Sequence, residues 1–226
     1  MKIKFARTQL LLFLIITCSA CSSESEGLIN LKRLCKKDAG LTVNNTVEAK
    51  GFYDDTTQCH HCWHELINTP FEYVEYCDFE SERHPLFFIL KDNGCYRLSK
   101  VKRASSQCHA EIDKELETII IEPFSSFNKE YCIKVESIEK PSSGLGLFLN
   151  YDEGMISKKG YDISRYEYTI KSLNDNKQYG KLINYSLVMK TVGGAGYSCS
   201  SFAVTGKRVQ IYKPSFYKSF IGKVIK

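Results

Sequence analysis

The chain of 226 residues has no apolar run long enough to cross a membrane as a helix. A spanning helix needs about 20 predominantly apolar residues. The unbroken run Leu10–Ile16 has seven residues, and a loose count from Leu10 to Cys21 gives only twelve. The N-terminal segment is therefore too short for an uncleaved span, and its length is typical of a cleaved export signal.

The chain also lacks a strong excess of one charge. It has 31 basic and 26 acidic residues, a formal net charge of +5. Loss of residues 1–20 removes Lys2, Lys4 and Arg7 and no acidic residue, so that 28 basic residues then face 26 acidic ones. This near neutrality gives no basis for a nucleic-acid partner, because binding to phosphates requires an excess of Lys and Arg.

The motifs of well-known active sites are missing as well. Gly193–Gly196 is not followed by the Lys-Ser/Thr of a phosphate-binding loop. The serines at 198, 200 and 201 have no nucleophile-elbow motif around them. The carboxylate pair Asp54-Asp55 is of a kind that occurs on any solvated loop. We therefore predict no catalytic residue and no cofactor, and expect that the protein is not an enzyme.

The N-terminus has the three-part form of an export signal. Basic residues at positions 2, 4 and 7 precede the apolar run, and the small residues Thr17-Cys18-Ser19-Ala20 follow it, directly ahead of Cys21. A cysteine in this place resembles the lipobox of bacterial lipoproteins, although Cys18 stands where that family usually has Leu. The resemblance implies cleavage before Cys21 and diacylglycerol on its thiol. The alternative is a plain secretory signal with a coincidental cysteine.

The lipobox resemblance implies an organisation for the whole chain. Residues 1–20 are the signal peptide, residues 21–27 a polar flexible tether, and residues 28–226 a single domain, with a sub-boundary near 140–146 as the alternative. By the same resemblance, Ser22 beside the lipidated cysteine favours the outer membrane over the inner one. We therefore expect a protein anchored by lipid to the outer membrane and facing the periplasm.

Ten cysteines are many for a chain of this length. Cys18 leaves with the signal and Cys21 takes lipid, so eight cysteines are disulfide candidates: Cys35, Cys59, Cys62, Cys77, Cys95, Cys108, Cys132 and Cys199. An even number in an exported protein predicts up to four disulfides, because the periplasm is oxidising. The connectivity cannot be chosen from sequence. Since only Cys199 lies beyond position 132, complete pairing requires a bridge from the C-terminal part to the front part.

The densest patch of reactive side chains is Cys59-His60-His61-Cys62-Trp63-His64. A c-type haem needs His directly after the second cysteine, where Trp63 stands. A thiol–disulfide oxidoreductase of the thioredoxin kind has an extended strand before the first cysteine, where Asp54–Gln58 stands. A zinc alternative uses Cys59, His60, Cys62 and His64, whose histidines fall at i and i+4 on one helix face. We favour the interpretation in which Cys59 and Cys62 are separate structural disulfide anchors.

Hydrophobic periodicity and turn signals predict an α+β fold, mainly antiparallel β-sheet with a few short helices and stapled by disulfides. Helices are expected over 27–37, 57–67 and 107–117. Extended segments are expected over 41–49, 71–79, 85–91, 94–101, 118–122, 131–138, 163–172, 179–191 and 208–213, with a turn-rich loop at 51–55. The hairpin of 163–172 with 179–191 has the most regular alternation.

The C-terminal tail has an apolar stripe at helical spacing, bordered by lysines. The stripe consists of Phe216, Tyr217, Phe220, Ile221, Val224 and Ile225. A helix of this kind either docks on a sheet of its own domain or lies on an anionic membrane surface. We favour docking.

The opening of the mature chain resembles a group of proteobacterial lipoproteins whose function is not established. The matching residues include Leu34–Gly40, Gly51–Asp54, Phe71–Glu75 and Cys95–Leu98, all in the front half. We therefore expect a non-catalytic periplasmic lipoprotein that binds a protein partner or supports the envelope, toxin immunity being one form. The alternative is an envelope thiol–disulfide or zinc-dependent protein that uses Cys59–His64.

Overall fold

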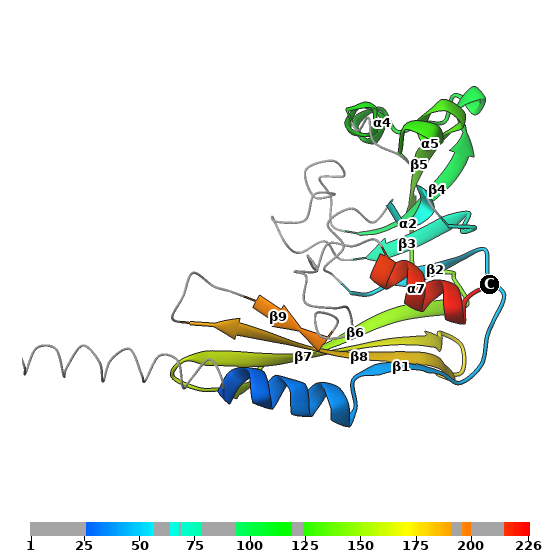
Figure 1. Ribbon diagram of the computed structural model, residues 1–226. Helices are drawn as coiled ribbons and strands as arrows, with labels where there is room; N and C mark the ends of the chain where they lie inside the picture. Colours follow the sequence, from blue (N-terminus) through cyan, green and yellow to red (C-terminus); the bar gives the residue numbers. More distant parts are fainter. Residues whose placement is uncertain are drawn as a thin grey trace, which may run out of the picture. The chain divides into compact units, whose positions relative to one another are not determined.

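The computed structural model describes residues 26–56, 64–67, 69–77, 94–118, 124–190, 196–199 and 215–226. Within these ranges the chain forms a mixed β-sheet with short helices (Figure 1). The expected α+β class is therefore confirmed. The sheet is partly parallel, because the strand Gly51–Asp54 (β2) runs parallel to both of its neighbours.

The other strands of the described chain are β1 (Gly40–Val43), β3 (Tyr73–Cys77), β4 (Cys95–Lys102), β5 (Tyr131–Ile138), β6 (Leu145–Ser157), β7 (Tyr161–Ser172), β8 (Gln178–Met189) and β9 (Gly196–Ser198). Their order in the sheet is β1-β8-β7-β6-β2-β3-β4-β5, and β9 pairs with β8. β4 pairs antiparallel with both β3 and β5. The predicted hairpin is the neighbouring pair β7 and β8, whose turn is closed by a bond from Ser172 N to Lys177 O (2.9 Å).

The described helices are α2 (His64–Ile67), α4 (Ala110–Glu117), α5 (Phe124–Glu130), α7 (Ser215–Val224) and an N-terminal helix over residues 26–37, with a 3-10 turn, η1, at Arg103–Ser105. The predicted helices over 27–37 and 107–117 are present as the N-terminal helix and α4. Gly40 has a φ of +136° where the chain leaves the N-terminal helix for β1, a conformation that only glycine adopts easily. No helix in these ranges is long and apolar enough to span a membrane.

By its internal contacts the chain divides into two compact units. The first unit contains the described residues of Met1–Leu41, Asn150–Glu167 and Leu182–Lys213. The second contains those of Thr42–Leu149, Tyr168–Lys181 and Pro214–Lys226. The strands β6, β7 and β8 contribute residues to both units. The predicted boundaries of the domain, 28 and 226, stay a prediction.

The core of the first unit lies between the N-terminal helix and one face of β7 and β8. Its buried residues are Leu31, Tyr161, Ile163, Ile183, Tyr185, Leu187 and Met189. Because successive strand residues point to opposite faces, the odd-numbered positions of these strands within the first unit face the helix. Tyr161 Oη accepts a hydrogen bond from Asn30 (2.8 Å), and Tyr185 Oη donates one to Asp38 (2.8 Å). These two tyrosines therefore hold both ends of the helix to the sheet.

The start of the helix differs from the expected tether over 21–27. Glu26 and Gly27 already belong to the helix, and Gly27 is buried. A Cβ at Gly27 would lie 3.1 Å from the ring of Tyr161, so the close approach of helix and strand favours glycine there. The polar composition that suggested a tether thus extends into the first helical turn.

The tail helix α7 docks within the second unit, as predicted. Phe220, Ile221, Val224 and Ile225 are all buried. A Cβ at Gly180 on β8 would lie 2.5 Å from Val224, so the helix contacts the strand at a position without a side chain. The side chains of Phe216 and Tyr217 lie outside the described part. The apolar stripe is therefore covered by the protein itself at its four described positions.

The expected loop at 51–55 is wrong, because residues 51–54 form β2 in the interior of the sheet. Phe52 is fully buried and contacts Phe71 edge-on, with ring centroids 5.1 Å apart. Gly51 looks like a turn residue in the sequence, but a Cβ there would lie 2.2 Å from the backbone oxygen of Tyr73. The glycine is required by close strand packing, which sequence cannot distinguish from a turn.

Several other predicted segments are tested only in part. The strands expected over 85–91 and 208–213 lie outside the described residues, as does most of 118–122 and of the helix expected over 57–67. The strand expected over 131–138 is present at those bounds as β5. The long strand β6 and the helix α5 were not predicted.

Candidate functional site

The structure places some of the candidate site residues and not others. Cys21, Cys59, His60 and Cys62 lie outside the described residues, and His64 is the first residue of α2, with its backbone alone described. Among the residues that the structure describes, no three His, Cys, Asp or Glu side chains are arranged to hold a metal ion. The lipidation site and the zinc alternative therefore stay predictions.

Six of the eight candidate cysteines form three disulfides. Cys35 pairs with Cys199, Cys77 with Cys95, and Cys108 with Cys132. The Cys35–Cys199 bridge joins the N-terminal helix to the residue after β9 and closes a sequence separation of 164 residues. A long-range bridge to Cys199 was expected, and the structure identifies its partner.

The carboxylate in the most unusual environment belongs to Asp54, at the end of the parallel strand β2. Its residue is only 5% exposed, and its side chain accepts a hydrogen bond from the backbone N–H of Thr56 (2.9 Å). Burial raises the pKa of Asp54 to about 6, against hydrogen bonds from Thr56 that lower it, and the charge of Asp55 adds a smaller rise. A carboxyl group of this kind takes up and releases a proton close to neutral pH.

The two residues of the Asp54-Asp55 pair therefore have different environments. Asp55 is exposed and accepts a hydrogen bond from the hydroxyl of Tyr53 (2.7 Å), as the solvated-loop interpretation predicts. Asp54 is buried, so that interpretation is wrong for it. The end of the strand explains the difference, because Asp54 is the last residue of the buried strand β2 and Asp55 is the first residue beyond it.

A second buried carboxylate, Glu75 on β3, is the centre of a hydrogen-bond network in the second unit. Its side chain is fully buried and pairs with Arg97 Nη2 (2.5 Å) and Nε (3.0 Å) on β4. It also accepts bonds from the backbone N–H groups of Ser142 and Ser143 (both 2.9 Å) and from Ser143 Oγ (2.6 Å). Arg97 lies over the ring of Tyr73, 4.5 Å from its centroid.

The Glu75 network explains the position of the loop that resembles a linker in the sequence. Burial alone would raise the pKa of Glu75, but the bonds from Ser143, Arg97 and Ser142 together outweigh it, so the pKa is lowered and the group is ionised. Because both carboxylate oxygens of Glu75 accept hydrogen bonds from Arg97 and the two serines, we assign Glu75 a structural role. This role is to fix residues 142–143 against β3. An acidic residue in the apolar strand Tyr73–Cys77 is the sequence signal for it.

The first unit has an open aromatic surface on the face of its strands that points away from the N-terminal helix. Tyr151 on β6 is 39% exposed and stacks on Tyr166 of β7, with ring centroids 4.7 Å apart. Ser186 on β8 donates a hydrogen bond to the Tyr166 hydroxyl (3.4 Å), and Val188, two residues further along the same face, is 47% exposed. We call Tyr151, Tyr166, Ser186 and Val188 the tyrosine face. Sequence analysis did not identify it.

Comparisons of the chain with protein-family models, with curated proteins and with solved structures find no significant match. Any assignment of function must therefore start from the residues themselves. The resemblance of the front half to a group of proteobacterial lipoproteins stays a prediction.

Proposed function

We propose that this protein is a lipid-anchored, non-catalytic protein of the bacterial envelope that binds a protein partner through its tyrosine face. The observation that carries the proposal is the open Tyr151–Tyr166 stack, which shares one face of the strands with the exposed Val188. Aromatic residues are enriched in the cores of protein interfaces, where they bury a large area at a low cost in conformational entropy. Support of the envelope and immunity against a periplasm-acting toxin are two forms of such binding.

The disulfides support an extracytoplasmic location. Three of them staple the described chain, and disulfides persist in oxidising compartments such as the periplasm. The N-terminal pattern that ends at Cys21 supplies the export signal and the lipid-bearing thiol. The buried Glu75–Arg97 pair is bonded to Ser143 and serves the fold, so we propose no chemical role for it.

The anchor is tested by metabolic labelling with radioactive palmitate and by membrane fractionation of a Cys21→Ser variant. We expect label on the wild-type protein and none on the variant, which becomes soluble in the periplasm or stays unprocessed. Matched replacement of the neighbouring Ser22 by Ala controls for changes at the cleavage region. A Cys21→Ser protein that is cleaved normally and still fractionates with membranes would show that the anchor is wrong.

The tyrosine face is tested with a photo-crosslinking amino acid placed at Tyr151 in living cells. Asp152 is the matched control, because it is the next residue of β6, is also exposed and points to the opposite face. We expect one adduct of defined mass from position 151 that is absent from position 152 and is lost when Val188 is replaced by Asp. Equal crosslinking at both positions, or none at 151, contradicts the proposal.

Asp54 favours a second candidate function, thiol–disulfide exchange with a partner protein by Cys59 and Cys62. A buried acid with a pKa near 6 stands at the end of β2, five residues before Cys59 in the sequence. Such an acid is suited to proton transfer at neutral pH. Disulfide mapping tests this candidate: a Cys59–Cys62 bond that is readily reduced supports it, and pairing of each with another cysteine excludes it. Elemental analysis for zinc tests the metal version.

A further inference from the structure

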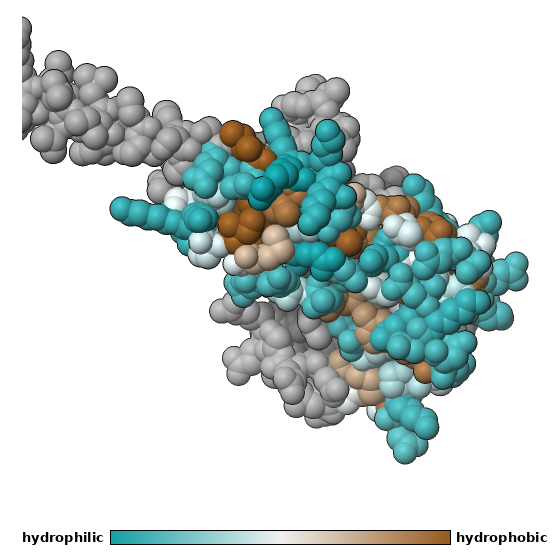
Figure 2. Space-filling view, turned by 90° about the horizontal axis from the view of Figure 1, so that it is seen from below, coloured by the Kyte–Doolittle hydropathy of each residue, from teal (hydrophilic) through white to brown (hydrophobic). Residues whose placement is uncertain are grey.

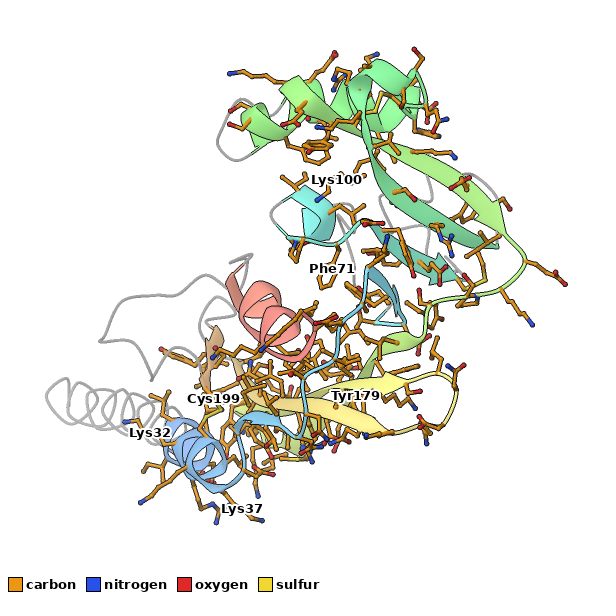
Figure 3. The ribbon with its side chains drawn as sticks, turned by 90° about the vertical axis from the view of Figure 1, so that its right-hand side faces the viewer. Lys32, Lys37, Phe71, Lys100, Tyr179 and Cys199 are labelled. Atoms are coloured by element: carbon orange, nitrogen blue, oxygen red, sulfur yellow. A yellow bond between two sulfur atoms is a disulfide. The ribbon has the colours of Figure 1, made fainter. Side chains whose placement is uncertain are left out.

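The N-terminal helix has two different faces. The face on β7 and β8 consists of Gly27, Leu28, Leu31, Leu34 and Cys35, which are buried or half-buried. The opposite face is exposed and consists of Ile29, Lys32, Arg33, Lys36 and Lys37. These exposed positions follow the i, i+3, i+4, i+7 spacing of one helix surface. Figure 3 shows Lys32 and Lys37 directed away from the sheet.

The charge of the exposed face is of one sign. Its four charged residues are all basic, and its one apolar residue, Ile29, is 65% exposed. Two acidic residues flank the face, one at each end of the helix, and both are bonded to the sheet: Glu26 accepts a hydrogen bond from Tyr161, and Asp38 from Tyr185. In Figure 2 the molecule is seen from below, and hydrophilic side chains predominate on this side, with separate apolar patches between them.

The orientation of this face within the first unit is fixed. The Cys35–Cys199 disulfide and the bonds of Tyr161 and Tyr185 hold the helix on β7 and β8. The distance from the predicted lipid is also limited. Glu26 is the fifth residue after Cys21, and an extended chain spans at most about 3.6 Å per residue, so Glu26 lies within about 18 Å of Cys21.

We propose that the basic face of the N-terminal helix lies on anionic phospholipid headgroups of the membrane that holds the anchor. The proposal rests on the proposed lipid anchor and adds to it a defined contact surface. Lysine and arginine side chains are attracted to an anionic bilayer within a Debye length, about 8 Å at physiological ionic strength. Ile29 is placed to enter the headgroup region beside them. The contact turns a flexible attachment into an oriented one.

The experiment uses the intact protein purified from membranes and reconstituted in vesicles of phosphatidylcholine, with or without phosphatidylglycerol. Lysines are acetylated with a water-soluble reagent and followed one by one by mass spectrometry. We expect acetylation of Lys36 and Lys37 to slow about fivefold with phosphatidylglycerol and to recover in high salt. Lys114 of α4 and Lys129 of α5 are matched controls, because each is exposed and lies in the last turn of a helix. Their rates should not change.

A variant pair gives an independent measurement. Lys36→Glu/Lys37→Glu should abolish the salt-sensitive protection of Lys32, whereas Lys114→Glu/Lys129→Glu, with the same charge change at helix ends, should leave it intact. Equal acetylation rates at Lys36 and Lys37 in both kinds of vesicle overturn the proposal and mean that the face is merely solvated.

Failure of the anchor itself is recognised separately. A purified protein whose intact mass lacks diacylglycerol, or that does not float with vesicles of phosphatidylcholine alone, contradicts the lipid anchor. A protein that carries the lipid and floats with both vesicles, with unchanged lysine rates, contradicts the headgroup contact alone.

Discussion

Replacing Asp54 by Asn should change how stability depends on pH. The pKa of Asp54 is about 6, compared with 3.8 for an ordinary aspartate. Between these values the folded protein keeps a proton that the unfolded chain releases, so the carboxyl lowers stability as the pH rises from about 4 to above 6. At about 1.36 kcal/mol per pH unit, the full effect of the carboxyl is about 3 kcal/mol.

An Asn side chain does not ionise in this range, so the variant escapes that loss. The free energy of unfolding of Asp54→Asn, relative to wild type, should therefore improve by about 2.4 kcal/mol between pH 4 and pH 8, the rest of the effect falling below pH 4. The difference between the two pH values is the informative quantity, since any effect of packing the amide contributes equally at both. The Oδ1 atom of Asn can still accept the bond from Thr56 N.

Urea unfolding followed by circular dichroism, with disulfides intact, measures this difference at a series of pH values. Asp55→Asn is the matched control, because it removes one carboxylate from the exposed neighbouring position. If the free energies of unfolding of wild type and Asp54→Asn change in parallel with pH, then the pKa of Asp54 is not raised and the inference from its burial is wrong. The role of Asp54 in the second candidate function would fall with it.

Two further predictions concern the fold. Glu75→Ala should destabilise the protein by about 3–5 kcal/mol, because it leaves the Arg97 charge without its partner. Since the pKa of Glu75 is lowered in the folded protein, this stabilisation should be present at neutral pH and be lost on acidification. Urea unfolding of wild type and variant at neutral pH and below pH 5 will show the difference. Cys35→Ser/Cys199→Ser should lower the free energy of unfolding by about 5 kcal/mol in the chain-entropy estimate for a long loop, and an unchanged thermal midpoint would contradict this.

The elements that could be predicted from sequence are those whose pattern is local. The strand β5 has its predicted bounds, and the β7–β8 hairpin follows from alternation on both sides of a polar turn. The burial of Val224 and Ile225 follows from the helical spacing of the tail stripe. In each case the residues that decide the structure are within a few positions of one another.

The elements that could not be predicted depend on distant neighbours. The strand β2 is held by parallel partners, β3 and β6, and its glycine is needed for close contact with Tyr73, a residue 22 positions away. β6 contains Asp152, Glu153 and Gly154, which hide its length in a sequence pattern. The burial of Asp54 and the Glu75 network likewise depend on which strands become neighbours.

The candidate surfaces have the same origin. Tyr151, Tyr166 and Ser186 come from three strands, and their alignment is a result of sheet order that no single segment contains. The basic face of the N-terminal helix is different, because the helical spacing of its cations is present in the sequence. What the structure adds is the face that is buried, and thus the side on which the cations stay exposed.

The Cys35–Cys199 bridge has a mechanical consequence. When a chain that is held at its N-terminal end is pulled from its C-terminal end, tension passes first along the N-terminal helix. At Cys35 the covalent path crosses directly to Cys199, so the backbone between them, which includes β1 to β9, is not in series with a load carried beyond position 199. Tension along that path would stretch the helix and the Cys35–Cys199 disulfide without separating the strands of the sheet, as long as the disulfide stays oxidised.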